Sequence, residues 1–183
     1  MNIKQLQVTY QPYADRLLLR ISASDGGEFR FWLTRRLVGL LAEPLAKHLQ
    51  GLPLNDDGAD RPEPPGSIEN PARQQAEAAF KHQQAVAGLQ SEKTFQSPPD
   101  QNFPLGEEPL LVAKLGVNPA DKGGVVLALH SKDNKGLSVQ LGSPLLHGFC
   151  DLLVKCSDQA SWGLALNLVP PTKVAEPPSK AFH

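Results

Sequence analysis

Apolar and polar residues alternate from Arg16 to Leu33, which limits this stretch to two β-strands joined by a turn at Asp25-Gly26-Gly27. The side chains of a strand point alternately to its two faces. One face of the pair is therefore apolar and consists of Leu17, Leu19, Ile21, Phe29, Phe31 and Leu33. The opposite face carries Arg16, Leu18, Arg20, Glu28, Arg30 and Trp32.

Two registers of this hairpin keep residues of the same face opposite each other. In the first, Arg20 faces Arg30, and the two guanidiniums repel each other unless an acid or a phosphate lies between them. In the second, shifted by two residues, Arg20 faces Trp32 in a cation–π pair and Asp25-Gly26-Gly27 forms a three-residue loop. The first register favours a bound anion, whereas the second needs none.

The flanking residues complete a first unit of three strands and a helix, residues 1–50. Ile3 to Tyr10 alternates as a strand and ends at a turn around Pro12. Thr34 is a suitable N-cap, so we expect a helix over Thr34–Gln50 that Pro44 kinks or splits. Its apolar stripe consists of Leu37, Val38, Leu40, Leu41 and Leu45.

The same pattern returns at an offset of 108 residues, from Leu17 to Val125. Without a gap, the six apolar positions of the first hairpin fall on Val125, Leu127, Leu129, Leu137, Val139 and Leu141. The turn falls on Asp133-Asn134, and after a one-residue slip Thr34 falls on Ser143, an N-cap followed by Pro144. An internal duplication and the general frequency of hairpin-plus-helix segments explain this match equally well.

Residues 110–169 form the second unit in this interpretation. Leu111 to Val117 alternates as its first strand and ends in a turn at Asn118-Pro119. A helix over Ser143–Asp158 follows the second hairpin. Ser161 to Val169 alternates again and is expected to be a final strand.

The remaining segments are expected to lack a core. Residues 51–109, which begin with the Pro-, Gly- and Asp-rich stretch 51–68, are predicted to be a flexible linker that carries an Ala/Gln-rich helix at about 70–89. Residues 170–183 are predicted to be a disordered tail. The fold class is therefore α+β: two β-β-β-α units with about seven antiparallel strands, in two sheets or one, and helices packed on one face. The two units are expected to form one globular domain.

No catalytic or cofactor motif occurs in the sequence: it contains no Gly-x-Gly-x-x-Gly, Walker loop, His-Glu-x-x-His or Gly-x-Ser-x-Gly. His147, Cys150 and Asp151 share one surface of the second helix, but their spacing fits no structural-zinc pattern. Cys150 and Cys156 lie on different faces of that helix, which predicts buried thiols rather than a disulfide. We therefore expect no metal, no cofactor and no enzymatic activity.

The charges of the chain balance, with 18 basic and 19 acidic residues and a formal net charge of −1. This excludes a general attraction to nucleic acid or to an anionic membrane. The first ten residues have no apolar run, and no segment approaches the roughly 18 apolar residues of a membrane span. We therefore expect no signal peptide, no membrane association and a cytoplasmic location.

The basic outer face of the first unit is the candidate binding site, formed by Arg16, Arg20, Arg30, Trp32, Arg35 and Arg36. Arginines bind phosphates and tryptophan stacks on bases, a combination typical of sheet-based single-strand binders. A solvated face held by an Arg–Glu28 contact explains the same residues. In the second unit Ala128, Ser138 and Gln140 stand in place of Arg20, Arg30 and Trp32.

Two strand-strand-strand-helix units in tandem resemble the single-stranded-DNA-binding regulators of the Whirly type, whose strand-rich units have one strand more and pack around a common core. That resemblance implies nucleic-acid binding through the basic face. Val126 and Ala128, however, make the second hairpin apolar on both faces, which indicates burial on two sides, by the chain itself or by a second copy. We therefore favour a non-catalytic binding or assembly protein that acts through protein–protein contacts, including a homodimer. A single-stranded nucleic-acid-binding regulator is the alternative.

Overall fold

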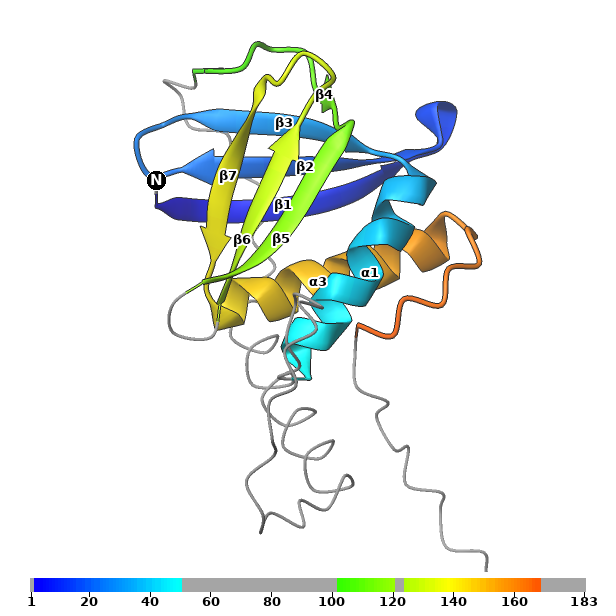
Figure 1. The fold of residues 1–183 in the computed structure, drawn as a ribbon. Coiled ribbons are helices and arrows are strands. Elements are labelled where there is room, and N and C mark those ends of the chain that lie inside the picture. Colours follow the sequence, from blue (N-terminus) through cyan, green and yellow to red (C-terminus); the bar gives the residue numbers. More distant parts are fainter. Residues whose placement is uncertain (1, 51–101, 121–123, 169–183) are drawn as a thin grey trace, which may run out of the picture.

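The computed structural model describes residues 2–50, 102–120 and 124–168, which form an α+β fold of two sheets and two helices (Figure 1). The first unit contains β1 (Ile3–Gln11), the short 3-10 helix η1 (Pro12–Ala14), β2 (Arg16–Ala23), β3 (Glu28–Leu33) and α1 (Arg35–Leu49). The second contains β4 (Leu110–Leu111), β5 (Lys114–Ala120), β6 (Gly124–His130), β7 (Gly136–Leu141) and α3 (Ser143–Gln159). The predicted linker up to residue 101, its helix at 70–89 and the tail at 170–183 lie outside the described residues.

The seven strands form two sheets rather than one continuous sheet. One has the order β1-β2-β3-β4 and the other β5-β6-β7. All neighbours are antiparallel except β4, which pairs in parallel with β3 at Phe31 and Trp32. The prediction of purely antiparallel strands is therefore wrong for β4.

The apolar faces of the two sheets pack against each other. In Figure 1 the sheet β5-β6-β7 lies in front, and its strands run across those of the sheet behind it. The largest buried side chains come from both sheets and include Leu17, Leu19, Ile21, Phe31, Leu127, Leu129 and Leu141. Because each sheet has only one strongly apolar face, each covers the other and both contribute to a single core.

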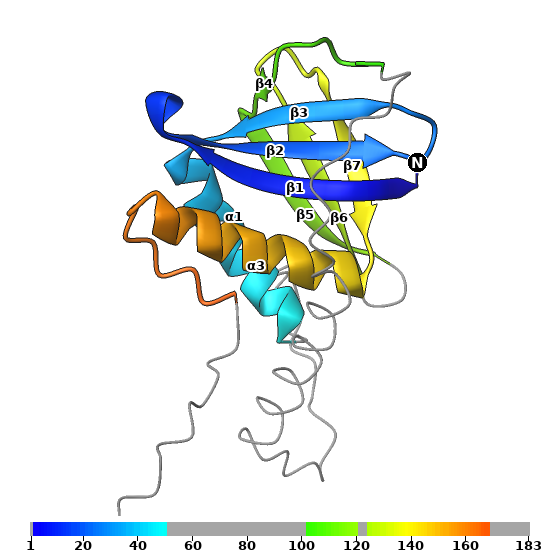
Figure 2. The same ribbon diagram turned by 180° about the vertical axis from the view of Figure 1, so that it is seen from behind.

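Each helix packs on a strand of the other unit. α3 lies along β1 (Figure 2), and α1 lies against β5. The Cys156 thiol on α3 donates to the Val8 carbonyl oxygen on β1, at 3.4 Å. The helices therefore close the side where β1 and β5 form sheet edges, and neither unit buries its apolar surface without the other.

The two hairpins correspond residue by residue at the offset of 108. Leu19 pairs with Phe31 and Leu127 with Val139, so the registers are the same. Both turns use the same backbone hydrogen bonds, Ala23 to Gly27 and Ser131 to Lys135. The equivalent turn residues Gly26 and Asn134 both have a left-handed backbone, with φ of 84° and 59°. The two turns therefore share one local geometry although their sequences differ.

The helices follow the same gapless offset, which corrects the predicted one-residue slip. α3 has Gly142 as its N-cap residue, where α1 has Thr34, and Ser143 is already helical. The buried residues Val38, Leu41 and Leu45 then correspond to Leu146, Phe149 and Leu153. Leu40, predicted to belong to the buried stripe, is 54% exposed. The slip would have paired this exposed residue with the fully buried Phe149.

Pro44 neither ends nor splits α1, which runs without a break from Arg35 to Leu49. The Thr34 hydroxyl accepts from the Leu37 amide at 3.4 Å, as the predicted N-cap requires. No helix in the described part of the chain is long and apolar enough to cross a membrane.

Two predicted strands are wrong in detail. The stretch from Leu111 to Val117 divides between β4 and β5, and Asn118 and Pro119 continue β5 instead of forming a turn. Proline is tolerated there because β5 is an edge strand, so its missing N–H interrupts no ladder. Residues 161–168 alternate in burial as expected, yet they pair with none of the described strands.

Candidate functional site

The outer face of sheet β1-β2-β3-β4 contains a three-residue ion network at the centre of the predicted binding site. The hairpin adopts the register in which Arg20 faces Arg30. Glu28, two residues before Arg30 on the same face of β3, receives both guanidiniums: Arg20 Nε lies 2.9 Å and Arg30 Nε 2.6 Å from its Oε1. Arg20 Nη2 also donates to Glu28 Oε2, at 3.2 Å. The anion required between the opposed arginines is therefore a residue of the chain itself.

Glu28 is the buried member of this network. Its side chain is 0% exposed, whereas those of Arg20 and Arg30 are 20% and 25% exposed. A buried carboxylate requires charged partners, since leaving it unpaired costs several kcal/mol. Both arginines therefore stabilise the fold, and their combined charge with Glu28 is +1 rather than +2.

Arg30 also contacts the segment that enters the second unit. Its guanidinium carbon lies 4.4 Å from the centre of the Phe103 ring, in a cation–π contact. Its Nη1 donates to the Glu107 carbonyl oxygen at 3.3 Å. The Glu28 amide donates to the Asn102 carbonyl oxygen at 2.9 Å, so backbone and side-chain contacts hold residues 102–107 against β3.

The other predicted site residues lie apart from this network. Arg16 begins β2, opposite Gln11, and is half-buried. Trp32 follows Arg30 on the same face of β3, but its cross-strand neighbours, Leu18 on β2 and Leu111 on β4, are apolar. Arg35 and Arg36 are exposed in the first turn of α1. The structure brings Arg20 and Arg30 together, but it does not gather all six residues around one open site.

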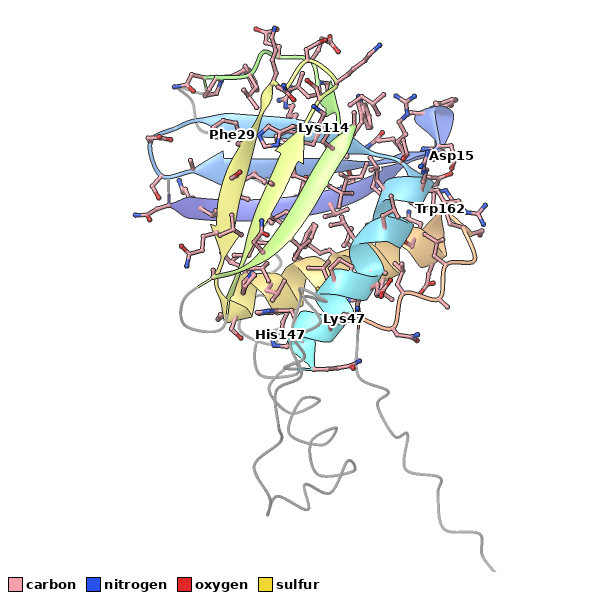
Figure 3. The ribbon with its side chains drawn as sticks, viewed as in Figure 1. Asp15, Phe29, Lys47, Lys114, His147 and Trp162 are labelled. Atoms are coloured by element: carbon pink, nitrogen blue, oxygen red, sulfur yellow. The ribbon has the colours of Figure 1, made fainter. Side chains whose placement is uncertain are left out.

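A second polar cluster joins the turn after β1 to the chain after α3. The Trp162 indole Nε1 donates to Asp15 Oδ1 at 2.8 Å, and the Tyr10 hydroxyl donates to the same oxygen at 3.2 Å. Figure 3 shows Asp15 and Trp162 side by side, although they are far apart in sequence. Desolvation and the hydrogen bond to Asp15 raise the pKa of Tyr10. This cluster fixes the start of the extended segment 162–168, and it was not foreseen from the sequence.

The residues of α3 that were considered for metal binding are either buried or paired with another residue. Cys150 and Cys156 are buried free thiols, as predicted, and burial raises the pKa of Cys150 to about 12. His147 is buried rather than at the surface, and Asp151 pairs with Lys155 at 2.7 Å. Among the described residues, no group of three His, Cys, Asp or Glu side chains is placed to hold a metal ion.

A shallow groove of about 160 Å³ runs between α3 and the extended segment after it. It is lined by Val154, Asp158, Leu164, Leu166, Asn167 and Leu168. Sites for small ligands typically enclose roughly 300–1,000 Å³ and place several polar groups around one point. The groove is smaller than that and mostly apolar.

The outer face of sheet β5-β6-β7 differs from its counterpart in the first unit. Gly116, Val126 and Ala128 are half-buried there, and Ser138 and Gln140 are exposed. The outer-face positions of β6 and β7 carry no Lys, Arg, Asp or Glu. Where the first unit has an ion network, β6 and β7 therefore present an uncharged surface of small, apolar and amide side chains, and Lys114 on β5 lies on the same face opposite His130.

Comparisons of the chain with protein-family models, with curated proteins and with solved structures find no match.

Proposed function

We propose that the chain is a non-catalytic assembly protein whose protein–protein contacts are made by sheet β5-β6-β7. The observation that supports this function most strongly is the outer face of β6 and β7, which is partly apolar and carries no Lys, Arg, Asp or Glu. Uncharged surface of this kind is typical of the centre of a protein–protein interface, from which charged residues are depleted. Leu40 is also exposed, on α1, the helix of the first unit that packs against β5.

The ion network argues in the same direction. Arg20 and Arg30 both hold Glu28, so the strongest positive charges of the predicted nucleic-acid site are already neutralised in part. A phosphate would have to compete with a buried carboxylate that lies within 3 Å of each arginine. The basic face is therefore better explained as structural than as a platform for nucleic acid.

The test is a binding experiment with the full chain immobilised. We compare the wild type with A128K, which places a charge in the uncharged outer face of β6 and β7, and use Q159K as the matched control at an exposed helix end. The expected result is a saturable protein partner, a second copy included, that A128K loses and Q159K retains. Absence of any partner and of self-association, or a partner equally well bound by A128K, would overturn the proposal.

Single-stranded nucleic-acid binding is the second candidate, favoured by the exposure of Arg35 and Arg36. It is tested by titrating labelled single-stranded oligonucleotides at two salt concentrations. Since Arg20 and Arg30 stabilise the fold, R35A/R36A is the cleaner variant. Binding at low salt that weakens in this variant and falls steeply with salt would favour nucleic acid over protein as the partner.

A further inference from the structure

Strand β7 is an edge strand that lacks the features by which natural edges avoid pairing. Among the described residues no strand or helix lies beyond it, and Figure 1 shows it at the free left side of the front sheet. Edge strands are usually protected by charged side chains, proline, bulges or a covering element. β7 reads Gly-Leu-Ser-Val-Gln-Leu, with no charge and no proline, and its pairing with β6 has no register shift.

The opposite edge of the same sheet is protected. β5 begins with the charged Lys114, contains Pro119, and has α1 packed against it. One edge of this sheet is therefore protected against pairing, and the other edge, β7, is not.

The first unit shows how the equivalent edge is used. At the offset of 108, Phe31 and Trp32 of β3 correspond to Val139 and Gln140 of β7. Phe31 and Trp32 pair with β4 on the side away from β2, and Gly27 forms a bridge with Asn102 on that side. The same edge thus accepts an added strand in the first unit, while in the described part of the second unit it has none.

We propose that β7 pairs antiparallel with β7 of a second copy, which joins two three-stranded sheets into one. This inference rests on the proposed assembly function and names its partner. Residues of the same face must lie opposite each other, so the two-fold axis passes through Ser138 or Val139 at the middle of the strand. With the axis at Ser138, Lys135 would oppose the buried Leu141. With the axis at Val139, Lys135 lies beyond the paired residues, because Ser143 is already helical, and this favours Val139 as the centre.

The strand is self-complementary in that register. On the inner face Leu137 of one copy lies opposite Leu141 of the other, and Val139 lies opposite itself. On the outer face Ser138 lies opposite Gln140, a hydroxyl beside an amide. Antiparallel pairing is thereby stabilised by apolar and hydrogen-bonding cross-strand pairs and involves no like charges. Pairing with a second copy therefore provides hydrogen-bond partners for the backbone N–H and C=O groups of β7 that point away from β6.

A charge-swap experiment tests the pairing on the full chain. In S138K/Q140K two lysines of one copy face two of the other, and in S138E/Q140E four carboxylates meet in the same way. Each variant should dimerise at least about tenfold more weakly than the wild type, and their equimolar mixture should recover the dimer. Q50K/Q159K, with two charges at exposed helix ends, should dimerise like the wild type.

Sedimentation velocity over a wide concentration range gives the measurement, and circular dichroism shows whether each variant is folded. A wild type that stays monomeric, or charge variants that dimerise normally, would overturn the pairing. Should the variants unfold, hydrogen exchange of the wild type decides. The β7 amides that point away from β6 must become more protected as the concentration rises, and unchanged protection of these amides refutes the pairing. A monomer that still binds another protein in an A128K-sensitive way refutes only the strand pairing and leaves the proposed function standing.

Discussion

Replacing Glu28 with glutamine should destabilise the chain strongly, because the E28Q variant keeps the shape of the side chain but removes its charge and turns one acceptor oxygen into a donor. Three hydrogen bonds, at 2.9, 3.2 and 2.6 Å, join this carboxylate to two guanidiniums. A hydrogen bond to a charged group contributes about 1.5–3 kcal/mol, against about 0.5–1.5 kcal/mol for a neutral one. Because glutamine keeps only one of the two acceptor oxygens, the loss over the three bonds is at least about 3–4.5 kcal/mol.

Water reduces this effect, since both guanidiniums remain partly exposed and regain some hydration. We therefore expect E28Q to lower the free energy of unfolding by about 2–3 kcal/mol. For a chain of this size that corresponds to a Tm lower by roughly 4–12 °C.

Urea denaturation of E28Q, R20Q and the double variant measures the coupling within the network. R20Q alone should cost about 1 kcal/mol because Glu28 keeps Arg30, and E28Q should cost about 1 kcal/mol less in the R20Q background than in the wild type. E43Q, at a side chain 77% exposed and paired with Lys47, is the control and should cost less than about 0.5 kcal/mol. An E28Q variant as stable as E43Q, or costs that add without coupling, would refute the structural role of the network.

Three further predictions concern the core and its anchors. Burial raises the pKa of Cys150 from 9.0 to about 12, so the folded state favours the neutral thiol. The resulting contribution to the free energy of unfolding is fully present below pH 9.0 and is lost as the pH rises towards 12. Denaturation titrations across that range should show C150A losing less stability than the wild type, and parallel losses would contradict this origin. W162F removes the donor to Asp15 and should cost about 1–2 kcal/mol, with faster hydrogen exchange in residues 162–168; unchanged exchange there would contradict the anchor. A Cβ at Gly136 would clash with the Leu129 carbonyl oxygen, whereas a Cβ at Gly142 would have open space around it. G136A should therefore lower the free energy of unfolding, measured by urea denaturation, by about 1–3 kcal/mol, and G142A should lower it much less. Equal losses in the two variants would contradict the close approach at Gly136.

The hairpins were predictable because alternation and the same-face rule leave few arrangements. Choosing between the two registers was not, since it depends on where one carboxylate points. Glu28 lies on the outer face, two residues before Arg30, so the sequence did contain the internal anion that the first register needs. Its burial, and the contact of Arg30 with Phe103, depend on tertiary packing that no local pattern encodes.

The differences between the predicted and the observed secondary structure also have physical causes. Residues 161–168 alternate because an extended chain lying on a core buries every second side chain, and that requires no neighbouring strand. Ser143 has the chemistry of an N-cap, yet α3 begins at Ser143 itself. The connection from strand to helix spans one residue in both units, Thr34 and Gly142, so geometry prevails over capping preference.

The candidate site was predictable only as a set of residue types on one face. Arg16, Arg20, Arg30 and Trp32 do share that face, as alternation required, whereas Arg35 and Arg36 belong to the start of a helix. The open edge at β7 had no signal of its own, because a strand's place in a sheet depends on partners distant in sequence.

Each unit packs its helix on a strand of the other unit, so the two units depend on each other as the subunits of a heterodimer do, although they belong to one chain. α1 ends at Leu49 and its strand, β5, begins only at Lys114, so the two meet through a contact distant in sequence. The entropic cost of bringing two segments of a chain together rises slowly, by about 0.6 kcal/mol of free energy for each doubling of the length between them. Insertions between the units should therefore be tolerated in evolution, while changes at the α1–β5 and α3–β1 contacts must be compensated on the partner element. Folding is expected to be slowed by this non-local closure, since neither half can complete a core in advance.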